Sequence, residues 1–230
     1  MGNMGTLGLA AVAFVGSHLL LSHPLRRPLV GAIGERPFLG LYSLVAFATL
    51  GWLIVAYGAA PASDPLWTVG NGIWVVVSVV MLVASVLLAG SLKSNPALPN
   101  PGRPAAPVGP ARGVFAVTRH PMMWAFALWG AGHVAVYPVA KNIVVAAAVT
   151  VLALVGAGLQ DVKKRQLQPE SWPAWEAKTS YWPFAAFVAG RARLGGFGVP
   201  ALVGGVVVWL AATWAHAPLA GFAAGAWRWL

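Results

Sequence analysis

The run VGNGIWVVVSVVMLVASVLLAGSL, residues 69–92, carries no charged side chain at any position. A helix needs about 20 predominantly apolar residues to cross a bilayer, so this run predicts a membrane-spanning helix. Similar apolar stretches occupy residues 4–22, 38–60, 122–140, 142–160 and 198–217. The sequence therefore predicts an all-α membrane protein with six transmembrane helices.

The composition agrees with that class. Of 230 residues, 59% are hydrophobic and only 9% are charged. Six spans use roughly 120 positions, and the remainder is too short for a separate globular domain, so residues 1–230 are predicted to form a single transmembrane domain. The absence of cysteine excludes disulfides, iron–sulfur clusters, thiolate haem ligation and cysteine nucleophiles. Metal chemistry would therefore depend chiefly on the five histidines.

The basic residues predict the orientation. The net charge of +10 does not indicate nucleic acid here, because the cations lie between apolar runs and face lipid. Of the 15 Lys and Arg residues, 13 fall in the loops after the first, third and fifth spans. Such loops stay cytoplasmic, which predicts that both termini lie outside. A signal peptide is not expected, because the first sixteen residues carry no Lys or Arg and further apolar segments follow.

Two predicted cytoplasmic loops are long. Residues 93–118 hold six prolines, which predicts an extended strap without helix or strand. Residues 160–197 begin with basic residues and continue with aromatic ones, a composition typical of a segment at the lipid headgroups. The second loop is expected to cap a site that opens to the cytoplasm.

Two histidines lie well inside predicted spans, away from the span ends, where an ionisable side chain is costly enough to mark a functional candidate. They are His18 in the first span and His133 in the fourth. His23 stands where the first span leaves the bilayer. At 100° per residue it lies about 140° around the helix from His18, which predicts that the two do not serve one metal.

The fourth span begins with Arg119-His120-Pro121, and proline suits a first helical turn. Arg119 and His120 are therefore expected at the cytoplasmic mouth. Deeper in this span, the glycines beside His133 leave room for a flat macrocycle or for a closely packed helix. His216, among tryptophans near the end of the last span, is interpreted as an interfacial anchor.

The two intramembrane histidines are the candidate ligands of a bis-imidazole haem b, which needs neutral histidines from two helices. Counted from the predicted span ends, the depths of His18 and His133 in the bilayer differ by about 10 Å, so a haem bound by both requires a tilted helix, a shifted span boundary or a tilted haem. Arg26, Arg27 and Arg119 are candidate partners for the haem propionates, or else residues that fix the topology. The alternative for both histidines is a structural hydrogen bond to a carbonyl or across helices.

Four blocks follow one another along the chain. They are residues 16–26, residues 41–46, residues 118–121 with 129–133, and residues 179–180 with 183–186. Together they resemble the NnrU family, a resemblance that covers nearly the whole chain. It implies a multi-pass protein of the bacterial inner membrane that is linked to denitrification and to nitrite and nitric oxide reductase systems.

That family is similar to the plastid 15-cis-zeta-carotene isomerase, a membrane enzyme that binds haem b through two histidines. By motif these ligands correspond to His18 and His133. The resemblance thus implies a haem-dependent redox or isomerase-like role with a hydrophobic small-molecule substrate or a membrane redox partner, but a shared fold does not carry over the carotenoid.

Two alternatives remain open. A more distant resemblance leads to the isoprenylcysteine and phospholipid methyltransferases, which share an Arg-His-Pro motif and a basic, acidic and aromatic C-terminal segment. It implies S-adenosylmethionine near Arg119, His120 and residues 160–183, although the acidic pair of those enzymes is not apparent after Asp161. The other alternative is a non-catalytic membrane partner or assembly factor whose basic loops dock a cytoplasmic protein.

Overall fold

The computed structural model describes residues 3–98 and 109–230, and within these ranges every regular element is helical. The long helices are α1 (Met4–Ser22), α3 (Glu35–Ala59), α4 (Asn71–Ser91), α6 (Pro121–Val136), α7 (Ala140–Leu167) and α10 (Val199–Ala220). The short ones are α2 (Arg26–Ile33), α5 (Val114–Val117), α8 (Ser171–Lys178), α9 (Ala185–Val188) and the 3-10 turn η1 (Gly225–Arg228).

Helices α1, α3, α4, α7 and α10 are long and apolar enough to cross a membrane. Much of their apolar surface is exposed, including Val12, Phe47, Val76 and Val207, as expected for side chains that face lipid. The prediction of an all-α, multi-pass membrane protein is confirmed.

The fourth predicted span, 122–140, is shorter than expected. Helix α6 has 16 residues and so extends about 24 Å, less than the roughly 30 Å of a hydrocarbon core. It ends at Val136 because Pro138 restricts Tyr137 and cannot continue the helix. Among residues 3–98 and 109–230, five helices are thus of spanning length, and the count of six stays a prediction.

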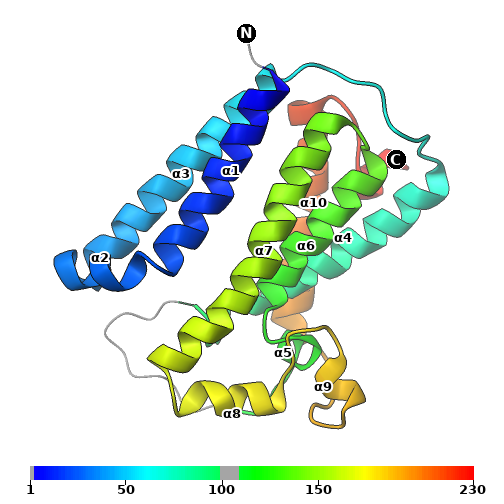
Figure 1. The fold of residues 1–230 in the computed structure, drawn as a ribbon. Coiled ribbons are helices and arrows are strands. Elements are labelled where there is room, and N and C mark those ends of the chain that lie inside the picture. The colour runs from blue at the N-terminus through cyan, green and yellow to red at the C-terminus, as the bar shows by residue number, and fades with distance from the viewer. Residues whose placement is uncertain (1–2, 99–108) are drawn as a thin grey trace.

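The long helices pack in a chain of neighbours. Helices α1 and α3 form a hairpin, and α1 contacts α7; α7 in turn packs on α6, α6 on α4, and α4 on α10 (Figure 1). Both termini lie at one end, called here the termini end, and α2, α5, α8 and α9 lie at the other, called the basic end (Figure 1). The loops predicted to be cytoplasmic therefore share one end, while the side of the membrane that it faces stays a prediction.

The hairpin joins the other helices near the termini end. Leu7, Ala10 and Phe14 of α1 are buried there in one cluster with Leu53 of α3 and Ala148 of α7. Toward the basic end the hairpin and α7 diverge (Figure 1). This divergence leaves space for the pockets described below.

The predicted loops contain more structure than expected. Helix α7 runs seven residues past the predicted end at 160 and stops only before Pro169, and helices α8 and α9 occupy part of the remaining segment. In the proline-rich strap, residues 95–98 form a turn closed by the Leu98 amide on the Asn95 carbonyl rather than an extended chain. Four of its six prolines, at positions 99, 101, 104 and 107, lie outside the described residues.

Candidate functional site

A cluster of charged side chains is buried where α6 begins. The Arg119 guanidinium donates from Nε to both oxygens of Asp161 at 3.0 and 2.9 Å, and His120 Nε2 lies 2.7 Å from Asp161 Oδ1. Arg119, His120 and Asp161 are 9%, 2% and 4% exposed. Both residues lie at the start of α6, at the basic end, and Asp161 draws their side chains into a buried ion cluster.

This cluster fixes the segment that covers it. The Arg119 amide donates to the Ser180 carbonyl at 2.8 Å, and the Thr118 hydroxyl donates to the Tyr181 carbonyl at 2.7 Å. Glu176 of α8 lies 3.5 Å from the Arg119 guanidinium. The Arg-His-Pro motif thus joins the start of α6 to the end of α7 and to residues 176–181.

Sequence reasoning missed the role of Asp161. The available signal was its position as the carboxylate that ends the long apolar run of α7, one of only five acidic residues in the chain. A carboxylate at such a place is rarely buried without a cation.

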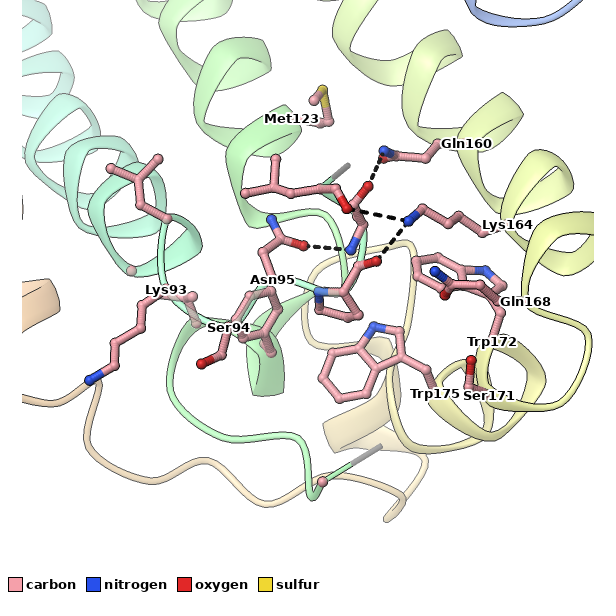
Figure 2. Close-up of a pocket in the computed structure, with 18 of the residues that line it drawn as sticks. Lys93, Ser94, Asn95, Met123, Gln160, Lys164, Gln168, Ser171, Trp172 and Trp175 are labelled. Atoms are coloured by element: carbon pink, nitrogen blue, oxygen red, sulfur yellow. Dashed lines mark hydrogen bonds between the residues drawn. The ribbon is translucent and has the colours of Figure 1, made fainter. Parts of the chain in front are cut away.

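A large pocket of about 1830 Å³ lies at the basic end, lined by residues of α2, α3, α4, α5, α7, α8 and the start of α10. Figure 2 shows the part of its wall formed by residues 93–95, the end of α7, and α8. Part of its wall is the turn at residues 95–98. Gln160 Nε2 donates to the Ala97 carbonyl at 2.9 Å, and Lys164 Nζ donates to the Pro96 carbonyl at 2.9 Å (Figure 2). We call this space the large pocket.

A second pocket of about 530 Å³ lies deeper between α1, α3, α6 and α7, and we call it the apolar pocket. Its walls are mostly apolar or aromatic: Phe14, Leu19, Leu50, Phe126, Trp129, Val149 and Leu152. Ser22, Tyr42, Met123, Gln160 and Lys163 line both pockets, so the two spaces adjoin. The apolar pocket therefore adjoins the large pocket along these five residues, which we call the seam.

His18 lines the apolar pocket. Its Nδ1 lies 2.7 Å from the Phe14 carbonyl, and its ring makes edge contacts with Phe14 and Tyr42. Because a carbonyl only accepts hydrogen bonds, Nδ1 is the donor in this contact, and in the neutral ring Nε2 is then the nitrogen with a lone pair. The ring can therefore offer one nitrogen to a ligand, while the structural hydrogen bond predicted as its alternative role is present at the other.

His23 lines the same pocket, contrary to the helical-wheel prediction that separated it from His18. Helix α1 ends at Ser22, and His23 departs from helical geometry with φ −126° and ψ −88°, so the rotation of 100° per residue no longer applies. Its Nδ1 donates to the Leu19 carbonyl at 3.2 Å, while Nε2 is buried without a partner. Burial and the nearby Lys163 ammonium lower the pKa of His23, which keeps the ring neutral.

His133 lies toward the termini end and lines neither pocket. Its Nδ1 donates to the Trp129 carbonyl at 2.8 Å, and its ring centroid lies 4.1 Å from that of Trp129 and 5.9 Å from that of His216 on α10. The structure therefore brings His133 to His216 and not to His18.

The glycines beside His133 accommodate neighbouring helices rather than a macrocycle. A Cβ atom on Gly130 would collide with Thr150 and lie 2.8 Å from the Ala146 carbonyl oxygen of α7. A Cβ atom on Gly132 would lie 2.9 Å from Met81 of α4. Of the two readings left open by the sequence, close helix packing is the one realised.

The remaining predicted residues occupy separate places. Arg26 lines the large pocket and forms an ion pair with Glu35 at 2.9 Å, while Arg27 is exposed and lines neither pocket. Across the described ranges, no group of three or more His, Asp or Glu side chains could hold a metal ion.

The family model described as NnrU protein matches residues 6–224, nearly the whole chain. No curated protein and no solved structure matches the chain. The chain belongs to the NnrU family, which confirms the resemblance seen in the sequence.

Proposed function

We propose that this NnrU-family membrane protein binds haem b in the apolar pocket through His18 and serves a redox or isomerase-like role linked to denitrification. One observation carries the proposal: His18 lines an apolar, aromatic pocket with its Nδ1 engaged by the Phe14 carbonyl, which leaves Nε2 as the atom for a ligand, and Lys163 stands at the edge of that pocket. A histidine nitrogen, a flat apolar space and a cationic edge are what a haem with its two propionates requires.

The residues present fit a haem held by one histidine. The pocket volume of about 530 Å³ lies within the range of cofactor sites. Phe126 and Trp129 supply aromatic walls, and Lys163 in the seam supplies a cation for a carboxylate. His18 would hold the iron, and the haem would supply redox chemistry.

We propose His18 in place of the pair of histidines predicted from the sequence. His133 packs beside His216 on α10 and lines neither pocket, whereas His18 lines the apolar pocket between α1, α3, α6 and α7. Arg119 is also withdrawn from the predicted set of propionate partners, because Asp161 and Glu176 neutralise it inside the bundle. The proposal therefore rests on His18 alone as the protein ligand of iron.

The chain's own residues would control access and protonation. Neutral His23 offers a buried acceptor atom at the edge of the same pocket, and Lys163 is held there by its hydrogen bond to Ser22 at 3.1 Å. A hydrophobic substrate or a membrane redox partner would approach from the lipid that surrounds the bundle.

Absorption spectra of the detergent-purified protein test the proposal. After haem-supplemented expression, a Soret band and sharp α and β bands on dithionite reduction are expected in the wild type. His18→Ala should lose most of the haem, whereas His133→Ala, the matched variant of an intramembrane histidine, should retain it. An empty wild-type spectrum, or haem loss in His133→Ala with retention in His18→Ala, would refute the assignment.

We do not extend the proposal to the methyltransferase alternative. The carboxylates nearest the Arg-His-Pro motif, Asp161 and Glu176, are both engaged in ion pairs and are not free for the amino group of S-adenosylmethionine. Calorimetric titration with that compound is the corresponding test, and micromolar binding would displace the haem proposal. A protein that bound neither compound would favour the non-catalytic partner.

A further inference from the structure

The large pocket is strongly cationic. Arg26, Lys93, Arg112, Lys163 and Lys164 all line it. Among the described lining residues the carboxylate is Glu35, and Arg26 already pairs with it. Cations that line a partly enclosed space raise the local concentration of anions, so this pocket favours a negatively charged ligand.

Two buried donors in the same wall lack acceptors. Trp172 and Trp175 of α8 line the large pocket and are 1% and 5% exposed. The Nε1 atoms of both rings are buried without a hydrogen-bond partner. An indole nitrogen only donates, and buried polar groups are nearly always paired, so two unpaired donors in one wall indicate that a ligand supplies the acceptors.

Lys164 supplies charge at the same place. Its ammonium lies 5.8 Å from the Trp172 ring and donates to the Pro96 carbonyl and, more weakly, to the Leu98 carbonyl (Figure 2). An ammonium has three N–H donors, so one remains for a further acceptor. Together, Lys164 and the two indoles provide one cation and three N–H donors from two adjacent elements.

We propose that the large pocket binds a phosphate-bearing ligand, with Lys164 and the indole nitrogens of Trp172 and Trp175 as donors. A phosphate suits this donor set because it combines high negative charge with several strong acceptor oxygens. The phosphate comes from a soluble compound or from a lipid headgroup. The proposal is separate from the haem site, because none of these three residues lines the apolar pocket.

Binding measurements with two probes distinguish the sources. Pyrophosphate in solution represents a soluble phosphate, and phosphatidic acid in mixed micelles represents a lipid headgroup, with phosphatidylcholine micelles as the neutral control. Saturable binding is expected for at least one of the two probes, measured by calorimetry and by tryptophan fluorescence. Pyrophosphate binding would identify a soluble source, and binding of phosphatidic acid alone would identify the headgroup.

Two variants test the donors. Trp175→Phe keeps an aromatic ring but removes the N–H, and Lys164→Gln removes the charge. Each should weaken binding of the active probe at least tenfold. Trp227→Phe and Lys141→Gln make the same changes at the termini end and should bind as the wild type does. If one variant fails to fold, the other remains decisive.

Two results would overturn the proposal: neither probe binds, or both pocket variants bind with wild-type affinity. Haem content measured in the same preparations separates this proposal from the previous one. Trp175→Phe should leave haem content unchanged, and a preparation without haem that still binds a phosphate probe would refute only the haem assignment.

Discussion

The Asp161→Asn substitution tests the buried ion cluster. Asp161 accepts from Arg119 Nε at 2.9 and 3.0 Å and from His120 Nε2 at 2.7 Å, and its side chain is almost fully enclosed. An amide of the same size places an N–H group against one of these donors and removes the negative charge. Arg119 then keeps only the more distant Glu176, at 3.5 Å, as a counter-charge.

The expected cost follows from the geometry. Removing one partner of a buried pair destabilises a protein by about 3–5 kcal/mol, because the remaining charge stays buried and uncompensated. For a chain of this length each kcal/mol lowers the melting temperature by roughly 2–4 °C, so the Tm should fall by about 6–20 °C. Residues 176–184, which the cluster holds in place, should become more accessible to protease before the bundle unfolds.

The effect on the Tm is measured by thermal unfolding of the wild type and the variant in the same detergent, monitored by size-exclusion chromatography. Arg165→Ala is the matched control, because Arg165 also pairs with a carboxylate, Glu176 at 2.8 Å, but its side chain is 52% exposed. An exposed pair contributes only about 0–1 kcal/mol. If Asp161→Asn changes the Tm no more than Arg165→Ala does, the cluster does not stabilise the fold and the reasoning is wrong.

Three further predictions follow from other parts of the structure. Gly130→Ala should destabilise the bundle by about 1–3 kcal/mol, because the added methyl collides with Thr150, whereas Gly51→Ala, with open space around it, should be tolerated in the same unfolding assay. The pKa of His23 is lowered in the folded protein, so the unfolded chain binds the His23 proton more readily. Acidification below about pH 6.5 should therefore lower the Tm of the wild type more than that of His23→Gln. An equal fall of Tm with pH in the two proteins would contradict this. Alkaline phosphatase fused after residue 230 should be active if the C-terminus lies outside, and an active cytoplasmic reporter there would reverse the predicted orientation.

The fold was largely predictable because long apolar runs determine where membrane helices form. Five predicted spans correspond to helices of spanning length, with most ends displaced by only a few residues. The larger errors have local causes. Pro138 ends α6 early, and α7 continues to Leu167 because polar residues without proline or glycine do not stop a helix.

The site was predictable only in part, because its residues meet through packing that no sequence spacing encodes. His18 was identified from its intramembrane position, and the structure places it in a pocket. Its predicted partner His133 lies elsewhere, since α10 brings His216 to that ring. His23 was separated from His18 by helical rotation, yet the helix ends one residue before it. Helical rotation therefore has no predictive value beyond a helix end.

The position of the two pockets follows from one stripe of α7. Val145 and Ala148 face the hairpin where it packs tightly, as part of the apolar cluster at the junction. Further along the same helix, Gly156, Gln160 and Lys163 take the corresponding places and line the pockets instead. Polar side chains of this kind are costly to bury against an apolar helix unless their hydrogen bonds are satisfied. The hairpin therefore packs on α7 where the stripe is apolar and diverges from α7 where the stripe becomes polar. This arrangement places His18 at the boundary between the apolar and the polar part of the stripe.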